Sequence, residues 1–246
     1  SLQKYLFRQL IPFRLSAYQG RRSYLEVLIF RFPLSDNRNK FALWYIKADV
    51  LQCFYSRFTA AVIGPGLGQS AAAKARLEAA LASNIPLVLD ADALNLIAGD
   101  KALLTTLLHR TVATVLTPHE AEGARLLKVT PQIIQSDRVN AVRDIALQTG
   151  AITVLKGPGT LIAMRSSRTW LSPYATASLA TAGSGFSMIA SFLGQRYDTV
   201  ESVLGAVMLH GYAGKERVAG LTASEIASIA VEPLETYRRT NARPYW

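Results

Sequence analysis

The chain has 246 residues, which is enough for one α/β domain with a substantial buried core. Its single cysteine, Cys53, excludes an intrachain disulfide framework and a cysteine-based zinc cluster. The net charge is +10, but residues 1–58 hold 10 Lys and Arg against 3 Asp and Glu, so most of the excess lies there. No segment approaches the roughly twenty apolar residues of a membrane span, and we expect a reducing, cytoplasmic setting without a membrane partner.

The composition changes near Phe58, since residues 1–58 contain 13 aromatic residues and one glycine of the chain's 16. We interpret residues 1–58 as an atypical basic, aromatic-rich segment of the same domain, and residues 59–246 as its core. Basic and aromatic residues together can bind single-stranded nucleic acid, but charge alone supports only salt-sensitive, non-specific binding. We therefore expect no specific nucleic-acid partner. The chain begins without Met or a signal-peptide pattern, which is expected of a fragment of something longer.

Strands and helices alternate from Thr59 onward. A strand over 60–63 leads through a glycine turn into a helix from Ser70 to Ala82, and a strand over 86–89 ends in polar residues. A third buried strand, over 112–116, precedes a helix start. This alternation predicts an α/β fold with a doubly wound, mostly parallel sheet. Ligand sites of such folds lie at the carboxyl ends of the strands.

The second half continues the pattern. A long amphipathic helix over 133–149 is predicted before a strand over 152–155. Gly157-Pro158-Gly159 predicts a tight turn, after which 160–163 returns as an antiparallel strand. Helices over 186–193 and from 200 to about 218 complete the series. His109 and His210 fit helical faces, and we interpret both as structural.

Polar or glycine-rich residues follow two of the predicted strands. The turn Gly64-Pro65-Gly66-Leu67-Gly68 lets a ligand approach the backbone or serves only close packing, and the sequence favours neither. Asp90 and Asp92 either bind magnesium through water, or orient a substrate, or cap a helix while Asn95 hydrogen-bonds the loop. These alternatives stay equally open.

The third strand leads into a predicted helix start. Here Thr117 is the expected N-cap, Pro118 the first helical residue and Glu120 the partner in a capping box. His119 would be held in the first turn, where it either binds a substrate amide or phosphate or simply decorates the helix. The second reading is favoured for a lone histidine.

Two further motifs suit phosphate groups. Lys156-Gly157-Pro158-Gly159-Thr160 places a cation and a hydroxyl around a turn, which fits a nucleotide phosphate or ribose, with an exposed hairpin as the alternative. The small residues Ala182, Gly183, Ser184 and Gly185 form a turn whose backbone N–H groups converge before a helix, as in anion sites. Phe186 ends this turn, where a phosphoryl-transfer enzyme places a proton-accepting Asp.

From about Ala60 to the C-terminal region, the chain resembles the ADP- or ATP-dependent NAD(P)H-hydrate dehydratases of the ribokinase-like superfamily. Six motifs in the same order carry the resemblance. These motifs are Gly64-Pro65-Gly66-Leu67-Gly68, Asp90-Ala91-Asp92-Ala93-Leu94-Asn95, Thr117-Pro118-His119 with Glu122, Lys156-Gly157-Pro158-Gly159-Thr160, Ala180-Thr181-Ala182-Gly183-Ser184-Gly185, and His210-Gly211-Tyr212-Ala213-Gly214.

The resemblance implies repair of hydrated NADH or NADPH (NADHX, NADPHX) at the expense of ADP or ATP. By motif, Gly66 and His119 would contact the hydrated dinucleotide, whereas Lys156 to Thr160 and Gly185 would hold the adenine nucleotide. Mg²⁺ would neutralise the transferring phosphate. By motif, Phe186 occupies the position of the family's catalytic Asp, which lies beside the substrate. Family members often form oligomers, so a homo-oligomer is compatible with the resemblance.

Three stretches depart from the family pattern. Phe186 cannot accept a proton, so the resemblance implies an impaired dehydratase, with a catalytically silent nucleotide-binding protein of regulatory or assembly role as the alternative. Tyr174-Ala175-Thr176-Ala177-Ser178 replaces an Asn- and Gly-rich approach to the phosphate turn. Residues 1–58 match only faintly, through Gln19-Gly20-Arg21 and a first strand at Val27-Leu28-Ile29. A further alternative is a small-molecule kinase that resembles hydroxyethylthiazole kinase. Such a kinase also needs a proton-accepting residue at this position, so Phe186 counts against it equally.

Overall fold

The computed structural model describes residues 14–18, 27–31, 59–166, 168–172, 174, 184–194 and 198–215. Near the N-terminus, β1 (Arg14–Tyr18) and β2 (Val27–Arg31) pair as a separate two-stranded antiparallel sheet. The strand predicted at 27–29 is therefore present, and its partner β1 was not predicted. The proposed division of the domain near Phe58 stays a prediction.

A mixed six-stranded sheet forms the centre of the fold, in the order β3-β4-β5-β6-β7-β8. Four strands are parallel: β3 (Ala61–Ile63), β4 (Leu87–Leu89), β5 (Thr114–Leu116) and β6 (Ile152–Leu155). Two antiparallel strands, β7 (Leu161–Ala163) and β8 (Thr169–Leu171), extend it. The four parallel strands and the antiparallel return after Gly157-Pro158-Gly159 are confirmed, and β8 was missed.

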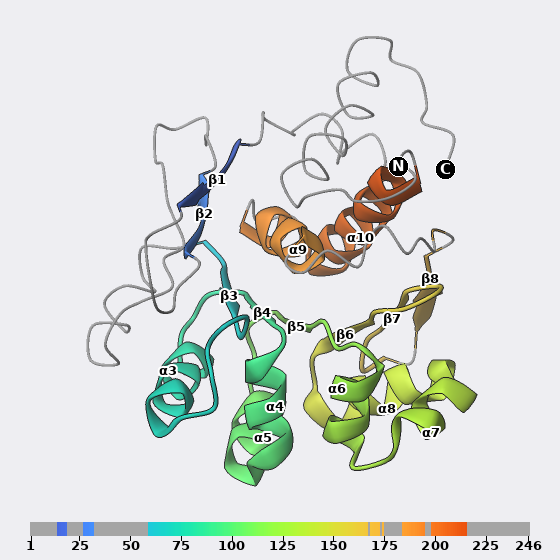
Figure 1. Ribbon diagram of the computed structural model, residues 1–246, viewed down its shortest axis with the longest axis horizontal. Coiled ribbons are helices and arrows are strands. Elements are labelled where there is room, and N and C mark those ends of the chain that lie inside the picture. Colours follow the sequence, from blue (N-terminus) through green and yellow to red (C-terminus); the bar gives the residue numbers. More distant parts are fainter. Residues whose placement is uncertain are drawn as a thin grey trace.

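Helices cover both faces of this sheet (Figure 1). One face carries α3 (Ala71–Leu81), α4 (Asp92–Gly99), α5 (Lys101–Leu108), α6 (Glu120–Leu127), α7 (Pro131–Ser136) and α8 (Arg138–Thr149). The other face carries α9 (Ser184–Gly194) and α10 (Thr199–Lys215), which pack against each other. The doubly wound architecture expected from the sequence is confirmed.

Alternating side chains on the short strands build the core on each side. Val62, Val88 and Val115 belong to the hydrophobic cluster that includes α9 and α10. Their neighbours Leu89 and Leu116 point the opposite way and join a cluster with α3, α4 and α5. Successive strand residues face opposite sides of a sheet, so apolar residues at every position are what a sheet covered on both faces requires.

The predicted single helix over 133–149 is wrong, because Asp137 interrupts it. Asp137 has φ −148° and ψ 76°, outside the helical region, and separates α7 from α8. Its carboxylate accepts a hydrogen bond of 3.0 Å from the Asn140 amide, which caps α8. The hydrogen bonds lower the pKa of Asp137, with the Asn140 amide as the largest cause. A residue that reads as part of one helical face is therefore the N-cap of a second helix.

Arg110 fastens the amino-terminal edge of the sheet. Its guanidinium donates to the carbonyls of Leu81, the last residue of α3, and of Ser83 at 2.7 Å and Ile85 at 2.5 Å, which lie between α3 and β4. It also donates to the Thr114 hydroxyl at 2.9 Å. One planar side chain thus joins the end of α3 to the start of β5.

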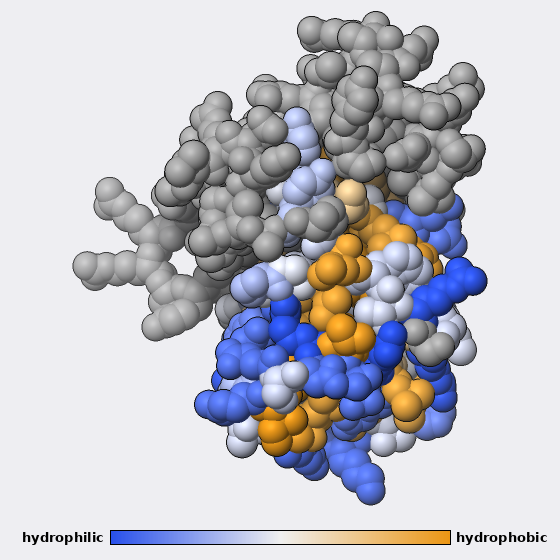
Figure 2. All heavy atoms as spheres, turned by 90° about the vertical axis from the view of Figure 1, so that its right-hand side faces the viewer, coloured by the Kyte–Doolittle hydropathy of each residue, from blue (hydrophilic) through white to orange (hydrophobic). Residues whose placement is uncertain are grey.

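The β8 side of the molecule combines polar and apolar surface. Figure 2 shows a band of apolar side chains between hydrophilic ones on this side. Among the exposed large hydrophobic residues, Leu171 on β8 is 64% exposed and Ile133 on α7 is 55% exposed. Within the described ranges, no helix is both long and apolar enough to cross a membrane.

Candidate nucleotide and substrate site

The glycine turn after β3 is bound tightly to the loop after β4. Gly64 has φ +133°, and a Cβ there would lie 1.7 Å from the carbonyl oxygen of Asp90, so only glycine fits. The Gly68 amide donates to Asp92 Oδ2 at 2.8 Å. Gly66 is different: it has φ +66°, is exposed, and nothing lies within 4 Å of a Cβ added there. The turn therefore combines a packing role at Gly64 with open backbone at Gly66.

The residues after β4 do not cap α4. Its N-cap is Ala91, which makes no side-chain capping hydrogen bond, so a capping role for Asp90 or Asp92 is wrong. Asp92 instead holds the Gly68 amide, and Asn95 Oδ1 accepts from Arg125 Nη1 at 2.9 Å. Asp90 is only 5% exposed and binds a lysine. Each of these polar groups ties two elements together.

Helix α6 begins two residues later than predicted. Thr117 still belongs to the strand ladder, because its amide and hydroxyl both bond to the Leu89 carbonyl, at 3.1 and 3.4 Å. The N-cap is His119, whose Nδ1 accepts from the amides of Ala121 at 3.1 Å and Glu122 at 3.4 Å. Glu122 Oε2 accepts from the His119 amide at 2.8 Å, which completes a capping box. The predicted roles of Thr117 and Glu120 are therefore wrong.

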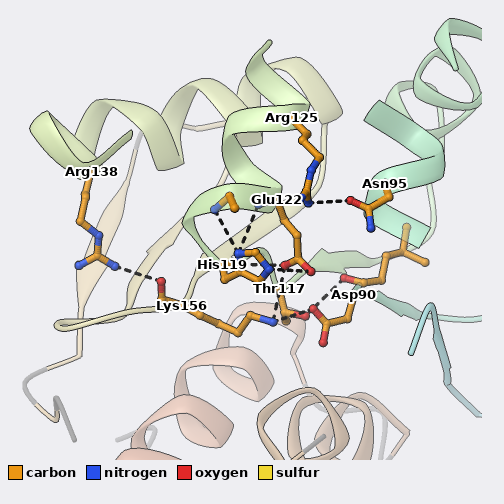
Figure 3. Close-up of polar contacts among 10 residues, drawn as sticks. Asp90, Asn95, Thr117, His119, Glu122, Arg125, Arg138 and Lys156 are labelled. Carbon is orange, nitrogen blue, oxygen red and sulfur yellow. Dashed lines mark hydrogen bonds and ion pairs between the residues drawn. The ribbon is translucent and has the colours of Figure 1, made fainter. Parts of the chain in front are cut away.

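Lys156, at the end of β6, joins Asp90 after β4 and Glu122 on α6 in one charged cluster (Figure 3). Its Nζ lies 2.7 Å from Asp90 Oδ1 and 3.8 Å from Glu122 Oε2. Glu122 Oε1 lies 3.3 Å from His119 Nε2. Both carboxylates are buried, whereas the Lys156 side chain is 41% exposed. Buried carboxylates need a paired cation, and at this edge of the sheet the partly exposed Lys156 supplies it.

Arg138, which the sequence reasoning missed, lies behind the Lys156–Thr160 turn. Its guanidinium donates to the carbonyls of Pro158, of Gly159 at 3.2 Å, of Lys156 at 3.3 Å and of Leu155 at 3.5 Å. Its Nε lies 3.5 Å from Glu120 Oε1. A signal was available, because a cation in the first turn of a helix opposes the helix dipole.

The start of α9 contributes the remaining candidates. Ala182 and Gly183 lie outside the described residues, and α9 begins at Ser184. A Cβ at Gly185 would lie 3.6 Å from Cε1 of His210 on α10, so the two helices approach closely there. Phe186 is 8% exposed and belongs to the core cluster with the strand valines. Burial lowers the pKa of His210 to about 4, which makes this imidazole neutral near pH 7.

The structure thus brings four of the sequence motifs together at the carboxyl ends of the parallel strands. The glycine turn contacts the Asp90–Asn95 loop, and that loop contacts Lys156, which reaches Glu122. His109 takes no part in this: it ends α5, with Nδ1 at 2.8 Å from the Thr105 carbonyl. A sheet edge with open glycine backbone and a partly exposed lysine is suited to binding phosphate groups.

Comparison with known proteins identifies the same group of proteins as the motifs do. Residues 36–231 match the family described as NAD(P)H-hydrate dehydratase. Over 180 residues the chain is 42% identical to the ADP-dependent (S)-NAD(P)H-hydrate dehydratase of Neisseria meningitidis, covering 69% of this chain and 60% of that protein. It is 41% identical over 171 residues to the bifunctional NAD(P)H-hydrate repair enzyme of Gloeobacter violaceus, covering 68% of this chain and 32% of that protein.

A solved structure agrees with this relationship. The ADP/ATP-dependent NAD(P)H-hydrate dehydratase of Bacillus subtilis, co-crystallised with ATP and Mg²⁺, superposes with a TM-score of 0.62 at 29% identity. The match covers 73% of this chain and 65% of that one. A ribokinase-like superfamily protein of Enterococcus faecalis superposes with a TM-score of 0.63 at 25% identity, covering 77% of this chain and 67% of that one, so the fold is ribokinase-like. The chain belongs to the NAD(P)H-hydrate dehydratase family.

Proposed function

We propose that this chain binds ADP, or ATP in its place, together with hydrated NADH or NADPH, and that its dehydration of the hydrate is impaired by Phe186. The observation that carries the proposal is the cluster around Lys156, in which motifs from four separate stretches meet at one sheet edge. The relatives named as hydrate dehydratases support the choice of substrates.

The proposed reaction has two steps. In the first, the bond to the terminal phosphoryl group of ADP breaks, AMP leaves, and the phosphoryl group bonds to the hydroxyl oxygen of the hydrated ring while a base removes the hydroxyl proton. In the second, the C–O bond breaks, inorganic phosphate leaves with the bonding electrons, and a ring proton is lost as the double bond re-forms. Restored NADH or NADPH is the product.

The chain's residues have distinct parts in this proposal. The backbone of the turn from Lys156 to Thr160, together with Gly185, would hold the adenine nucleotide. The exposed backbone at Gly66 and the half-exposed imidazole of His119 would contact the hydrate. The ammonium group of Lys156 would contact a phosphate oxygen while it keeps its contact with Asp90 Oδ1, and its side chain is 41% exposed.

A magnesium ion would be held mainly by the nucleotide itself. Among the residues that the structure describes, no three His, Cys, Asp or Glu side chains gather closely enough to hold a metal. Asp90 and Asp92 are already bound to Lys156 and the Gly68 amide. This arrangement fits an ion bound to phosphate oxygens and water, as Mg²⁺ usually is. When bound, the ion would neutralise the charge of the transferring phosphate.

Phe186 is the proposed cause of weak turnover. A positioned general base contributes about 10²- to 10⁴-fold to a rate, and a phenyl ring cannot accept the hydroxyl proton. The alternative function is a silent adenine-nucleotide-binding protein with a regulatory or assembly role. The observation that favours it is that Phe186 is only 8% exposed and part of the core, so this position stabilises the α9 layer.

The test is recovery of NADH from its hydrate with ADP and Mg²⁺, followed by absorbance. We expect Phe186→Asp to turn over about 10²- to 10⁴-fold faster than the unchanged chain. Phe186→Asn is the matched control, because it removes the same packing without supplying a base, and it should stay slow. Circular dichroism of all three chains checks that they are folded.

Two other results would change the proposal. Turnover of the unchanged chain at the rate of Phe186→Asp would place the base elsewhere. Tight ADP binding without turnover in any variant would support the silent nucleotide-binding protein. If neither ADP nor ATP bound to the folded chain, both functions would be wrong.

A further inference from the structure

The position of Arg138 on α8 is unfavourable for the helix. Arg138 is the first residue of α8, where the helix dipole favours negative rather than positive charge. Asp137, the N-cap before it, satisfies the Asn140 amide without help from Arg138. Helix stability therefore does not account for an arginine here, and its contacts lie in the turn at the end of β6.

Arg138 gathers four carbonyl oxygens, one from Leu155 at the end of β6 and three from the turn that follows. Nη1 donates to Pro158 and to Gly159, and Nη2 donates to Leu155 and to Lys156. The Arg138 side chain is 16% exposed. The planar guanidinium carries five N–H donors in a rigid fork, and four carbonyls of a five-residue stretch fit that fork. The turn is held on one side by a single cation.

The contacts with the carbonyls determine where the amides of the turn lie. Every described peptide bond is trans, and in a planar trans peptide the N–H points opposite to the C=O. The carbonyls of Lys156, Pro158 and Gly159 face Arg138, so the amides of Gly157, Gly159 and Thr160 face away from it. These three N–H groups therefore lie on the side of the turn away from Arg138, where backbone donors can meet an anion.

Gly157 is shaped to accept this arginine. It has φ +144°, and a Cβ there would lie 2.6 Å from Nη2 of Arg138. Gly159, with φ +66°, also needs backbone freedom. Glu120 forms an ion pair with the other side of the guanidinium, with Oε1 3.5 Å from Nε, although Nε makes no hydrogen bond. Glu120 Oε2 accepts from Gln135 Nε2 at 2.7 Å. Arg138 is thus fixed before any ligand binds.

We propose that Arg138 is a positioning residue that preorganises the Lys156–Thr160 turn, so that three backbone amides are aimed at a nucleotide phosphate or ribose. The inference rests on the proposed nucleotide role of this turn. Arg138 itself touches no ligand: its planar fork holds the carbonyls, and its positive charge lies behind the donors. Lysine cannot replace it, because an ammonium group has three donors and no fixed plane.

The experiment compares the unchanged chain with Arg138→Ala and Arg138→Lys in two measurements. Hydrogen exchange without ligand reports the order of the turn, and we expect faster exchange at Gly157, Gly159 and Thr160 in both variants. Calorimetric titration with ADP should show affinity lowered by about tenfold or more, a loss of about 1.4 kcal/mol. Millimolar methylguanidinium should partly restore ADP binding to Arg138→Ala, whereas methylammonium should not.

Arg110→Ala is the matched control. Arg110 also gathers several carbonyls, but at the opposite edge of the sheet. Its loss should lower thermal stability and leave the affinity for ADP unchanged. If Arg110→Ala lost a similar amount of ADP affinity, the effect of Arg138→Ala would be explained by general destabilisation of the fold. That result would overturn the inference.

The inference and the proposed function can fail separately. Unchanged exchange at 157–160 in Arg138→Ala would show that the turn is ordered without the arginine, which overturns the inference whatever the chain binds. If exchange rose as expected while the unchanged chain bound neither ADP nor ATP, the ordering role would stand and the proposed nucleotide site would be wrong.

Discussion

At the scale of single residues, two glycines of one turn differ in what they require. A Cβ at Gly64 would overlap the Asp90 carbonyl oxygen at 1.7 Å, and φ is +133°. Gly66 has φ +66° and open space around it. We expect Gly64→Ala to destabilise the fold by about 4 kcal/mol or more, because backbone must move. Gly66→Ala should cost only about 1 kcal/mol, the strain of the left-handed region.

Urea unfolding of the two variants measures this difference. Binding should show the opposite ranking, with the larger effect at Gly66. Folded Gly66→Ala is expected to bind the hydrate more weakly than the unchanged chain, since a methyl group would stand where the ligand approaches the backbone. Equal stability of both variants would show that the β3 turn relaxes away from Asp90. The contact would then not explain why glycine is present.

At the scale of elements, the capping box fixes both α6 and the charged cluster. Glu122 accepts from the His119 amide at 2.8 Å and also lies 3.8 Å from Lys156 Nζ. We expect Glu122→Ala to lose about 1 to 2 kcal/mol, as other lost caps do, because it leaves the amide unpaired. Glu122→Gln keeps an acceptor for the amide and should lose less. Thermal unfolding ranks the two variants, and equal losses would mean that the charge matters and the cap does not.

The elements also show what the sequence can and cannot predict. The parallel strands were predictable because short buried runs end in glycine or polar residues. The start of α6 was not, since Thr117 is kept in the ladder by Leu89, which lies 28 residues earlier. The break at Asp137 was hidden within a continuous helical period. Arg138 was missed because its partners lie 17 to 21 residues away. The local sequence shows only a positive charge at the start of a helix, where the helix dipole disfavours it.

At the scale of the whole molecule, the candidate site draws on both helical layers. The Lys156 cluster is built from the sheet and α6, whereas Gly185 comes from α9 on the other face. The α9–α10 pair therefore does more than cover the core valines, because it also carries Gly185, a candidate nucleotide-binding residue. His210 on α10 lies against Gly185, so protonation of this buried imidazole would make the α9–α10 packing depend on pH.

Acid should weaken this layer through His210. Burial lowers the pKa of His210 from 6.5 to about 4 in the folded chain. Between these values the unfolded chain binds a proton that the folded chain does not, so stability falls as pH is lowered through this window. Below pH 4, the loss of unfolding free energy due to this residue reaches about 3 kcal/mol. His210→Gln should flatten urea-unfolding stability between pH 6.5 and 4, whereas His109→Gln, at an exposed position, should not. An unchanged slope in His210→Gln would show that other groups govern acid sensitivity.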